Sequence, residues 1–346
     1  MKRSLLAASI LTLGLAAPAL ATDNLSAINQ IGNDHEVAIT QNGNAKNSST
    51  VKQDNASGVG VVAGGAGNKA TVKQTSTGAL NKNTSNILQV GNQHEITVNQ
   101  TGSNNENTAD TRQHSYNKNK ATVDQTGTNN KNTAVTFQYG KEEVAEIKQD
   151  GTNNINKSNL TQSGEKNFAQ IQQTGTNNSN ESMVNLEAGI SNKLLINQRG
   201  TDNDNYSFAR TYGNDNKIDV LQEGTNNYNW SKVQTTDDGD KNNVQVVQRG
   251  TNNINKSDVL VGMHDNDVNI LQEGHQNTNI AKVETKSGSN NEVDLIQNGS
   301  HTTNKASISA NGSSNEITVN QGGNNNTNVS SISALGNGNV VSVNQN

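Results

Sequence analysis

The chain has 346 residues, of which only 29% are hydrophobic and 3% aromatic, with one Pro and no Cys. Too few large apolar side chains are present to fill an ordinary core of that size. Instead, 63 Asn and 25 Gln make up about a quarter of the chain. The net charge of -5, with no basic run, argues against a nucleic-acid binder. The lack of Cys excludes a disulfide framework and a thiolate metal site.

The first residues predict an export signal. Basic residues 2–3 precede an apolar stretch over residues 5–15, which is too short to cross a bilayer. Residues 19–21 (Ala-Leu-Ala) have the small side chains of a signal-peptidase site. We therefore expect residues 1–21 to be a secretory signal peptide. Residues 22–346 would then be the mature chain, in which we expect no transmembrane segment.

Thirteen glutamines, each of which follows a short aliphatic run, mark a repeat of 24 to 26 residues that is regular from Gln100 onward. Two residues before each Gln stands Val, Ile or Leu, and the residue four before it is apolar. The residue six before it is Asn in ten of the thirteen copies, including Asn119, Asn167, Asn192 and Asn216, with His35, His94 and Glu143 in the others. This alternation predicts a β-strand with one buried face. The ladder glutamines are Gln41, Gln74, Gln100, Gln125, Gln149, Gln173, Gln198, Gln222, Gln248, Gln272, Gln297, Gln321 and Gln345.

A second strand is predicted between successive glutamine strands. It starts with Asn in all thirteen copies, from Asn24 to Asn328. The position two residues later is always Ser or Ala, and the position four residues later is mostly aliphatic. Gly and Asn, which tolerate the positive φ of tight arcs, separate the two strand types. Each repeat is therefore expected to be strand, arc, strand, arc.

Such a repeat can fold only by stacking. One rung buries about three aliphatic side chains, which is too little to offset the ordering of about 24 residues. Stacked rungs pair each strand with its copy above and below and place identical amides about 4.8 Å apart. We therefore predict an all-β fold, a β-solenoid with two strands per rung, about 13 rungs and amyloid-like stacking. The Gly-rich stretch 54–67 is predicted to loop out as an insertion.

The repeat resembles the curlin repeat, whose pattern is Gln-x-Gly-x-x-Asn-x-Ala-x-x-x-Gln. Gln162, Gly164, Asn167, Ala169 and Gln173 match it literally. The resemblance implies a secreted structural subunit of curli, the functional amyloid fibres of bacterial biofilm matrix, which supports adhesion and aggregation. It also implies three partners: further copies of the chain, a nucleating subunit and an outer-membrane secretion apparatus. The Gly-rich segment that guides family members to their secretion pore is missing between signal and first repeat.

No residue pattern indicates an enzyme, a metal site or a cofactor. The six His share no ligand spacing and are interpreted as solvated turn residues. The acidic stretches 237–240 and 264–267 lack the Gly-rich nonapeptide of a calcium β-roll. Outward aromatic residues are expected to stack along the solenoid, with a carbohydrate- or dye-binding strip as the alternative: Tyr206, Phe208, Tyr228 and Trp230.

Three functions fit the sequence. The favoured one is a structural subunit that polymerises outside the cell, and the alternatives are a minor nucleating curlin subunit and a monomeric β-solenoid adhesin or binding module. The two ends of the repeat array favour polymerisation, because neither is capped and an open strand edge templates pairing. We expect head-to-tail growth through two sets of end residues, and we expect Pro at positions 341 and 343 to block the growing edge. These residues are Asn24, Ser26, Ile28 and Gln30 at one end and Val341, Val343 and Gln345 at the other.

Overall fold

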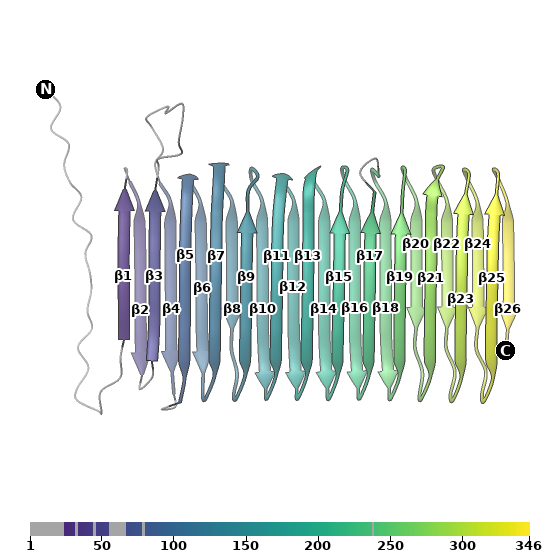
Figure 1. Ribbon diagram of the computed structural model, residues 1–346, viewed down its shortest axis with the longest axis horizontal. Coiled ribbons are helices and arrows are strands. Elements are labelled where there is room, and N and C mark those ends of the chain that lie inside the picture. The colour runs from purple at the N-terminus through teal and green to yellow at the C-terminus, as the bar shows by residue number, and fades with distance from the viewer. Residues whose placement is uncertain (1–23, 32–33, 44–45, 55–66, 78–79, 237–238) are drawn as a thin grey trace, which may run out of the picture.

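The computed structural model describes residues 24–346, apart from 32–33, 44–45, 55–66, 78–79 and 237–238. The expected signal peptide, 1–21, and nearly all of the expected insertion, 54–67, lie outside these described residues. The described residues form 26 strands, β1 to β26, and no helix. Two sheets of 13 parallel strands result, one from the odd-numbered and one from the even-numbered strands (Figure 1).

The odd-numbered sheet contains the strands that carry the Asn column from Asn24 to Asn328, which is the first residue of β1 and the second residue of the other strands. Its members are β1 (Asn24–Ile31), β3 (Lys46–Asp54), β5 (Lys82–Asn92), β7 (Glu106–Asn117), β9 (Lys131–Gln138), β11 (Ile155–Glu165), β13 (Ser179–Ile190), β15 (Asp204–Thr211), β17 (Tyr228–Thr235), β19 (Ile254–Val261), β21 (Thr278–Ser287), β23 (Thr303–Asn311) and β25 (Thr327–Leu335).

The even-numbered sheet contains the strands that carry the ladder glutamines. Its members are β2 (Glu36–Gly43), β4 (Lys69–Ser76), β6 (Glu95–Gly102), β8 (Lys120–Gln125), β10 (Val144–Thr152), β12 (Phe168–Thr176), β14 (Lys193–Thr201), β16 (Lys217–Thr225), β18 (Asn243–Thr251), β20 (Asp267–Gln272), β22 (Glu292–Gln297), β24 (Glu316–Gln321) and β26 (Val340–Gln345).

Each strand pairs with the equivalent strand of the rungs before and after it. Ile147, for example, is in register with Val123 on one side and Ile171 on the other. Along each interior strand buried and partly exposed residues alternate, and the buried aliphatic side chains of both sheets form one continuous core. The predicted β-solenoid with two strands per rung is therefore confirmed.

The arcs are tight because of Gly and Asn. Gly127 has a φ of 122°, and a Cβ there would lie 2.0 Å from the carbonyl oxygen of Gly151 in the next rung. Only Gly fits at that position. Two residues later, Asn129 has a φ of 53°, a left-handed conformation that Asn adopts more readily than most residues.

Candidate assembly surface

The ladder glutamines lie one above another inside the solenoid. Each Nε2 donates to the Oε1 of the next copy toward the C-terminus, from Gln41 to Gln74 at 2.8 Å through to Gln321 and Gln345 at 2.9 Å. The same nitrogen also reaches a backbone carbonyl of the odd-numbered sheet, such as Tyr206 O, 2.9 Å from Gln222 Nε2. The thirteen amides therefore form one chain of hydrogen bonds that links both sheets.

The Asn residues at the beginning of the odd-numbered strands, from Asn24 to Asn328, form a second ladder with the opposite direction. Asn47 Nδ2 donates to Asn24 Oδ1 at 2.9 Å, and the pattern continues to Asn328, which donates to Asn304 at 2.9 Å. The Gln ladder thus donates toward the C-terminus, whereas this Asn ladder donates toward the N-terminus. The two ends of the solenoid are consequently different.

The Asn residues before the even-numbered strands join rungs through the backbone. The backbone N–H of Asn192 donates to Asn167 Oδ1 at 3.0 Å, while Asn167 Nδ2 donates to Gly189 O at 3.0 Å. Asn192 and Asn216 repeat the first contact with the next rung, each at 2.9 Å, and Asn119 accepts the N–H of Glu143 at 3.1 Å. From Asn119 to Asn216, the Asn side chains of this stapling column therefore accept backbone N–H groups of the next arc and do not bond to each other.

A further buried Asn column lies in the opposite arc and was missed by the sequence analysis. Asn105 Oδ1 accepts the N–H of Asn130 at 2.9 Å, and Asn105 Nδ2 donates to Gly127 O at 2.7 Å. Its members are Asn81, Asn105, Asn130, Asn154, Asn178, Asn203, Asn227, Asn253 and Asn277, with Thr302 in the next rung. The signal in the sequence is the second Asn of a recurring Thr-Asn-Asn, as in residues 128–130, although an Asn in an arc is explained equally well by its tolerance of positive φ.

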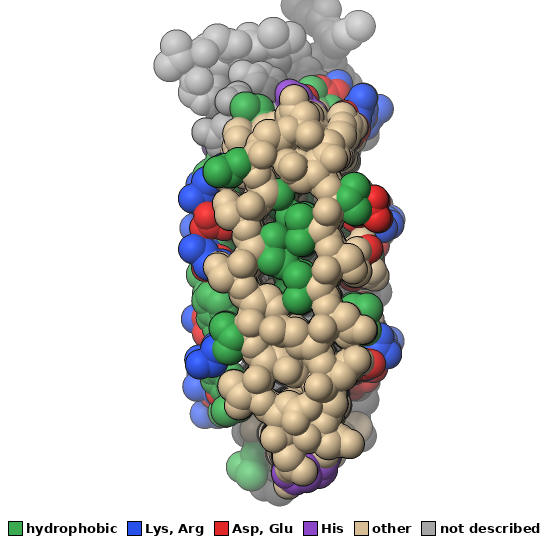
Figure 2. All heavy atoms as spheres, turned by 90° about the vertical axis from the view of Figure 1, so that its right-hand side faces the viewer, with side chains coloured by type: hydrophobic (Ala, Val, Ile, Leu, Met, Phe, Trp, Pro, Cys, Tyr) green, Lys and Arg blue, Asp and Glu red, His purple; other side chains and the backbone are tan. Residues whose placement is uncertain are grey.

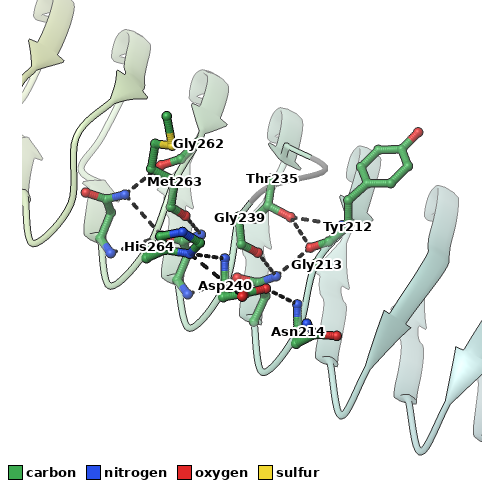
Figure 3. Close-up of polar contacts among 12 residues, drawn as sticks. Tyr212, Gly213, Asn214, Thr235, Gly239, Asp240, Gly262, Met263 and His264 are labelled. Atoms are coloured by element: carbon green, nitrogen blue, oxygen red, sulfur yellow. Dashed lines mark hydrogen bonds and ion pairs between the residues drawn. The ribbon is translucent and has the colours of Figure 1, made fainter.

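Figure 3 shows polar contacts in the arc that leads into the even-numbered strands. Asp240 Oδ1 accepts the N–H of Asn214 at 2.6 Å, and His264 Nδ1 accepts the N–H of Asp240 at 3.3 Å. An accepting Nδ1 places the ring proton of a neutral His264 on Nε2. Asp240 and His264, from the acidic stretches considered for ion binding, thus bind neighbouring arcs. In the described part of the chain, no three His, Cys, Asp or Glu side chains are grouped so as to hold a metal ion.

Two residues that replace Asn in the stapling column are also buried. The interpretation of every His as solvated is wrong for His94, which is fully buried; its Nε2 lies 3.1 Å from Val90 O and its Nδ1 accepts the N–H of Asn119 at 3.3 Å. Glu143 is likewise fully buried, and its Oε2 accepts the N–H of Gly140 at 3.1 Å. Burial raises the pKa of Glu143 to about 7, against smaller opposing effects of Gly140 and Asn167.

At the two ends of the solenoid, aliphatic side chains of the core are partly exposed. At the C-terminal end Ile332, Val341 and Val343 are only partly buried, and Figure 2 shows hydrophobic side chains in the middle of this end. Val37 and Ile39 are partly buried at the N-terminal end. Equivalent residues of interior rungs, such as Val319, are fully buried. Each end therefore has apolar surface that one more rung would cover.

The direction in which each backbone N–H and C=O points decides which residues of β26 can pair with a further strand. The N–H groups of Glu316 and Gly322 in and after β24 donate to the carbonyls of Asn339 and Gln345, each at 2.8 Å. Successive residues of a strand direct their backbone groups to opposite sides. Val341 and Val343 share the orientation of Gln345 and therefore face β24. The groups that point away from β24 belong to Val340, Ser342 and Asn344, so the choice of Val341 and Val343 for the Pro test was wrong.

The aromatic residues considered as a binding strip lie on the outward side of the odd-numbered sheet. Tyr206 and Trp230 are stacked, with ring centroids 6.3 Å apart. Phe208 is partly exposed and Tyr228 is 41% exposed.

A shallow groove on the other side of the molecule follows the Gly-rich arcs after β14 to β24, beside Arg199, Glu223, Arg249 and Glu273. Among the described residues there is no helix long and apolar enough to cross a membrane.

Comparison with known families identifies the repeat. A family model described as the curlin associated repeat matches residues 288–323, which include β22, β23 and β24. This chain carries the curlin repeat. The predicted resemblance is thereby confirmed for these residues, and strand pairing shows that the matched rungs are in register with the neighbouring rungs of the solenoid. No curated protein matches the chain.

Proposed function

We propose that this curlin-repeat protein is a secreted structural subunit that assembles head to tail into extracellular, curli-like amyloid fibres of a biofilm matrix. The observation that carries the proposal is the match between its two ends. The N-terminal end presents β1 and β2, and the C-terminal end presents β25 and β26. The inward columns of these strands match except where Gln30 of β1 would meet Ala334 of β25. Among the described residues, each end also has partly exposed core side chains and a strand edge with no further strand beside it, which favours pairing with another chain.

In this junction β1 of one copy pairs with β25 of the copy before it, and β2 pairs with β26. Asn328 Nδ2 already donates to Asn304 Oδ1 and Gly322 O, so its Oδ1 is left to accept from Asn24 of the next copy. Gln345 Nε2 donates to Val329 O at 3.2 Å and has a second hydrogen for Gln41 of the next copy. Such a contact does not close into a ring, so it produces a filament that lengthens by roughly 60 Å per subunit.

Residues 1–21 would direct export and be removed. The relationship to curlin repeats supports a location on the bacterial surface, a secretion apparatus in the outer membrane and a nucleating subunit as partners, and a role in adhesion and aggregation.

Ser342→Pro tests head-to-tail growth. Ser342 is exposed in β26, and its N–H points away from β24, where it would donate to the carbonyl of Val37 in the next copy. Proline removes that donor and places its ring against the incoming strand, while an edge strand tolerates it. We expect elongation from preformed seeds, followed by dye fluorescence, to slow by about tenfold or more, since each 1.4 kcal/mol is a factor of ten.

The control is Ser342→Ala, which keeps the backbone donor and should elongate like the parent protein. Circular dichroism of the soluble chains checks that both variants are folded. Equal elongation rates for Ser342→Pro and Ser342→Ala would show that fibres do not grow by pairing at β26.

A further inference from the structure

The first outward column of the even-numbered sheet lies five residues before each ladder Gln. The order of its positive and negative residues differs between two parts of the solenoid. In β2 to β8 the signs alternate, as Glu36, Lys69, Glu95 and Lys120. Lys69 Nζ lies 3.6 Å from Glu36 Oε2, and Lys120 Nζ lies 3.7 Å from Glu95 Oε2. In this part of the solenoid, neighbouring members of the column therefore form ion pairs with each other.

From β14 to β24 the same column separates its charges by sign. Its members are, in order, Lys193, Lys217, Asn243, Asp267, Glu292 and Glu316. Lys193 is in register with Lys217, and Glu292 is in register with Glu316. Like charges directly opposite each other destabilise a sheet. The described structure contains no ion pair of any of these five charged side chains. Lys193 Nζ lies 6.0 Å from the centre of the Phe168 ring, and Asp267 accepts a hydrogen bond from Asn243 at 3.1 Å, but neither contact requires like charges on adjacent strands.

An aliphatic strip runs along the same face, separated from these charges by a mostly polar column three residues before each ladder Gln. Leu221, Val247, Leu271 and Ile296 lie just before successive ladder glutamines, point outward and are partly exposed. The side chains just after those glutamines include Arg249 and Glu273, 3.6 Å apart. The first outward column is thus basic toward the N-terminal rungs and acidic toward the C-terminal rungs, while Asp219 and Glu223 of β16 add two acidic side chains to the same face.

This pattern is complementary to itself. A two-fold axis parallel to the strands, placed between β18 and β20, reverses the order of the rungs and keeps every column opposite its own copy. Lys217 then faces Glu292, and Lys193 faces Glu316. Val247 faces Leu271, Leu221 faces Ile296, and Phe168 of β12 faces Val340 of β26. One like-charge pair opposes the contact, Asp219 with Asp294.

We propose that the outward face of β14 to β24 is the lateral contact between two antiparallel copies of this solenoid. Six strands of about six residues offer roughly 500 Å² per partner, below the ~800 Å² of a standard stable interface. A single pair of chains therefore associates weakly. In a fibre the same face recurs once per subunit, and the contacts act together. The inference rests on the proposed head-to-tail fibre, which it would pair side by side with a second fibre running in the opposite direction.

A charge swap tests the lateral contact. One variant carries Lys193→Glu and Lys217→Glu, and the other carries Glu292→Lys and Glu316→Lys. In each variant the facing charges become alike, so electron microscopy should show single fibres, with the paired fraction reduced at least fivefold. Mixing preformed fibres of the two variants makes the facing charges opposite again and should restore pairing. A control that makes the same change of net charge as the first variant but on the other sheet, Lys256→Glu with Lys305→Glu, should pair like the parent protein.

Sedimentation of the same samples measures fibre yield separately from pairing. If fibre yield is normal and the charge-reversed variants still form paired fibres, the lateral contact is overturned. The same holds if mixed fibres of the two variants remain single. In both cases head-to-tail growth is unaffected. Absence of fibres from the parent protein itself would overturn the proposed assembly and the lateral contact together.

Discussion

At the scale of single residues, Glu143 is the most unusual side chain of the solenoid interior. It occupies a column that is mostly Asn, between Asn119 of the rung before and Asn167 of the rung after. An amide there is neutral at every pH, whereas a buried carboxylate must lose its hydration. Lys141 does not neutralise it, because that Nζ lies 3.2 Å from Glu165 and 4.0 Å from Glu142.

We predict that Glu143 makes the solenoid less stable as the pH rises. The pKa of this carboxyl increases from 4.5 to about 7 on folding, so the folded state favours the protonated form. Its contribution is fully present below pH 4.5 and is lost as the pH rises to about 7, a change of about 3 kcal/mol. Glu143→Gln should remove most of this dependence, measured as urea midpoints at pH 4.5 and pH 8. Glu146→Gln, on the outward side of β10, is the control, and identical pH profiles for Glu143→Gln and the parent would contradict the prediction.

At the scale of the strand, two neighbouring rungs weaken the aliphatic column of the odd-numbered sheet. Thr111 of β7 and Thr136 of β9 occupy the position held by Ile87 and Leu160 in the rungs on either side. Both threonines are fully buried, and their hydroxyl oxygens have no hydrogen-bond partner among the described residues. An unpaired buried hydroxyl costs about 1 to 3 kcal/mol.

Thr136→Val should therefore stabilise the solenoid. Valine has nearly the same shape, fills the same space and leaves no polar group without a partner. We expect a gain of about 1 kcal/mol in the free energy of unfolding, and a larger gain when Thr111→Val is added. Thr133→Val, which changes an outward residue of the same strand, should have little effect. A destabilised Thr136→Val would show that the hydroxyl is satisfied by a group not seen here, such as a water molecule.

The strands also show how far the sequence predicts this molecule. The period of two residues reveals which side chains point inward, and the repeat of the columns sets the register, so both sheets could be predicted. Neither of these patterns reveals which neighbouring rung a backbone N–H faces. The sequence therefore favours Val341 and Val343 for the Pro test, whereas the structure favours Ser342. The buried role of Asn105 was also hidden, because an Asn in an arc is explained equally well by its tolerance of positive φ.

At the scale of the whole molecule, the strands at the two ends match in every inward column except one. A second glutamine ladder runs through Gln30, Gln53, Gln89, Gln113, Gln138 and Gln162. From Gln30 to Gln138, each Nε2 donates to the Oε1 of the next Gln toward the C-terminus. It stops at β13, where Leu186 takes the position, and Ala334 occupies it in β25. In a head-to-tail junction Gln30 would therefore meet Ala334, and its Oε1 would receive no donor from the copy before.

Ala334→Gln should repair this column and tighten the proposed junction. A glutamine there would donate from its Nε2 to Gln30 of the next copy, continuing the ladder across the junction. A net hydrogen bond contributes about 1 kcal/mol, which corresponds to a roughly fivefold lower concentration of free subunit at equilibrium with fibres. Ala334→Leu is the matched control, because Leu has a similar size, already occurs in this column as Leu186, and lacks the donor. The residual soluble concentration after assembly separates the two variants: a Gln variant no lower than the Leu variant would show that Gln30 and position 334 do not meet in the fibre.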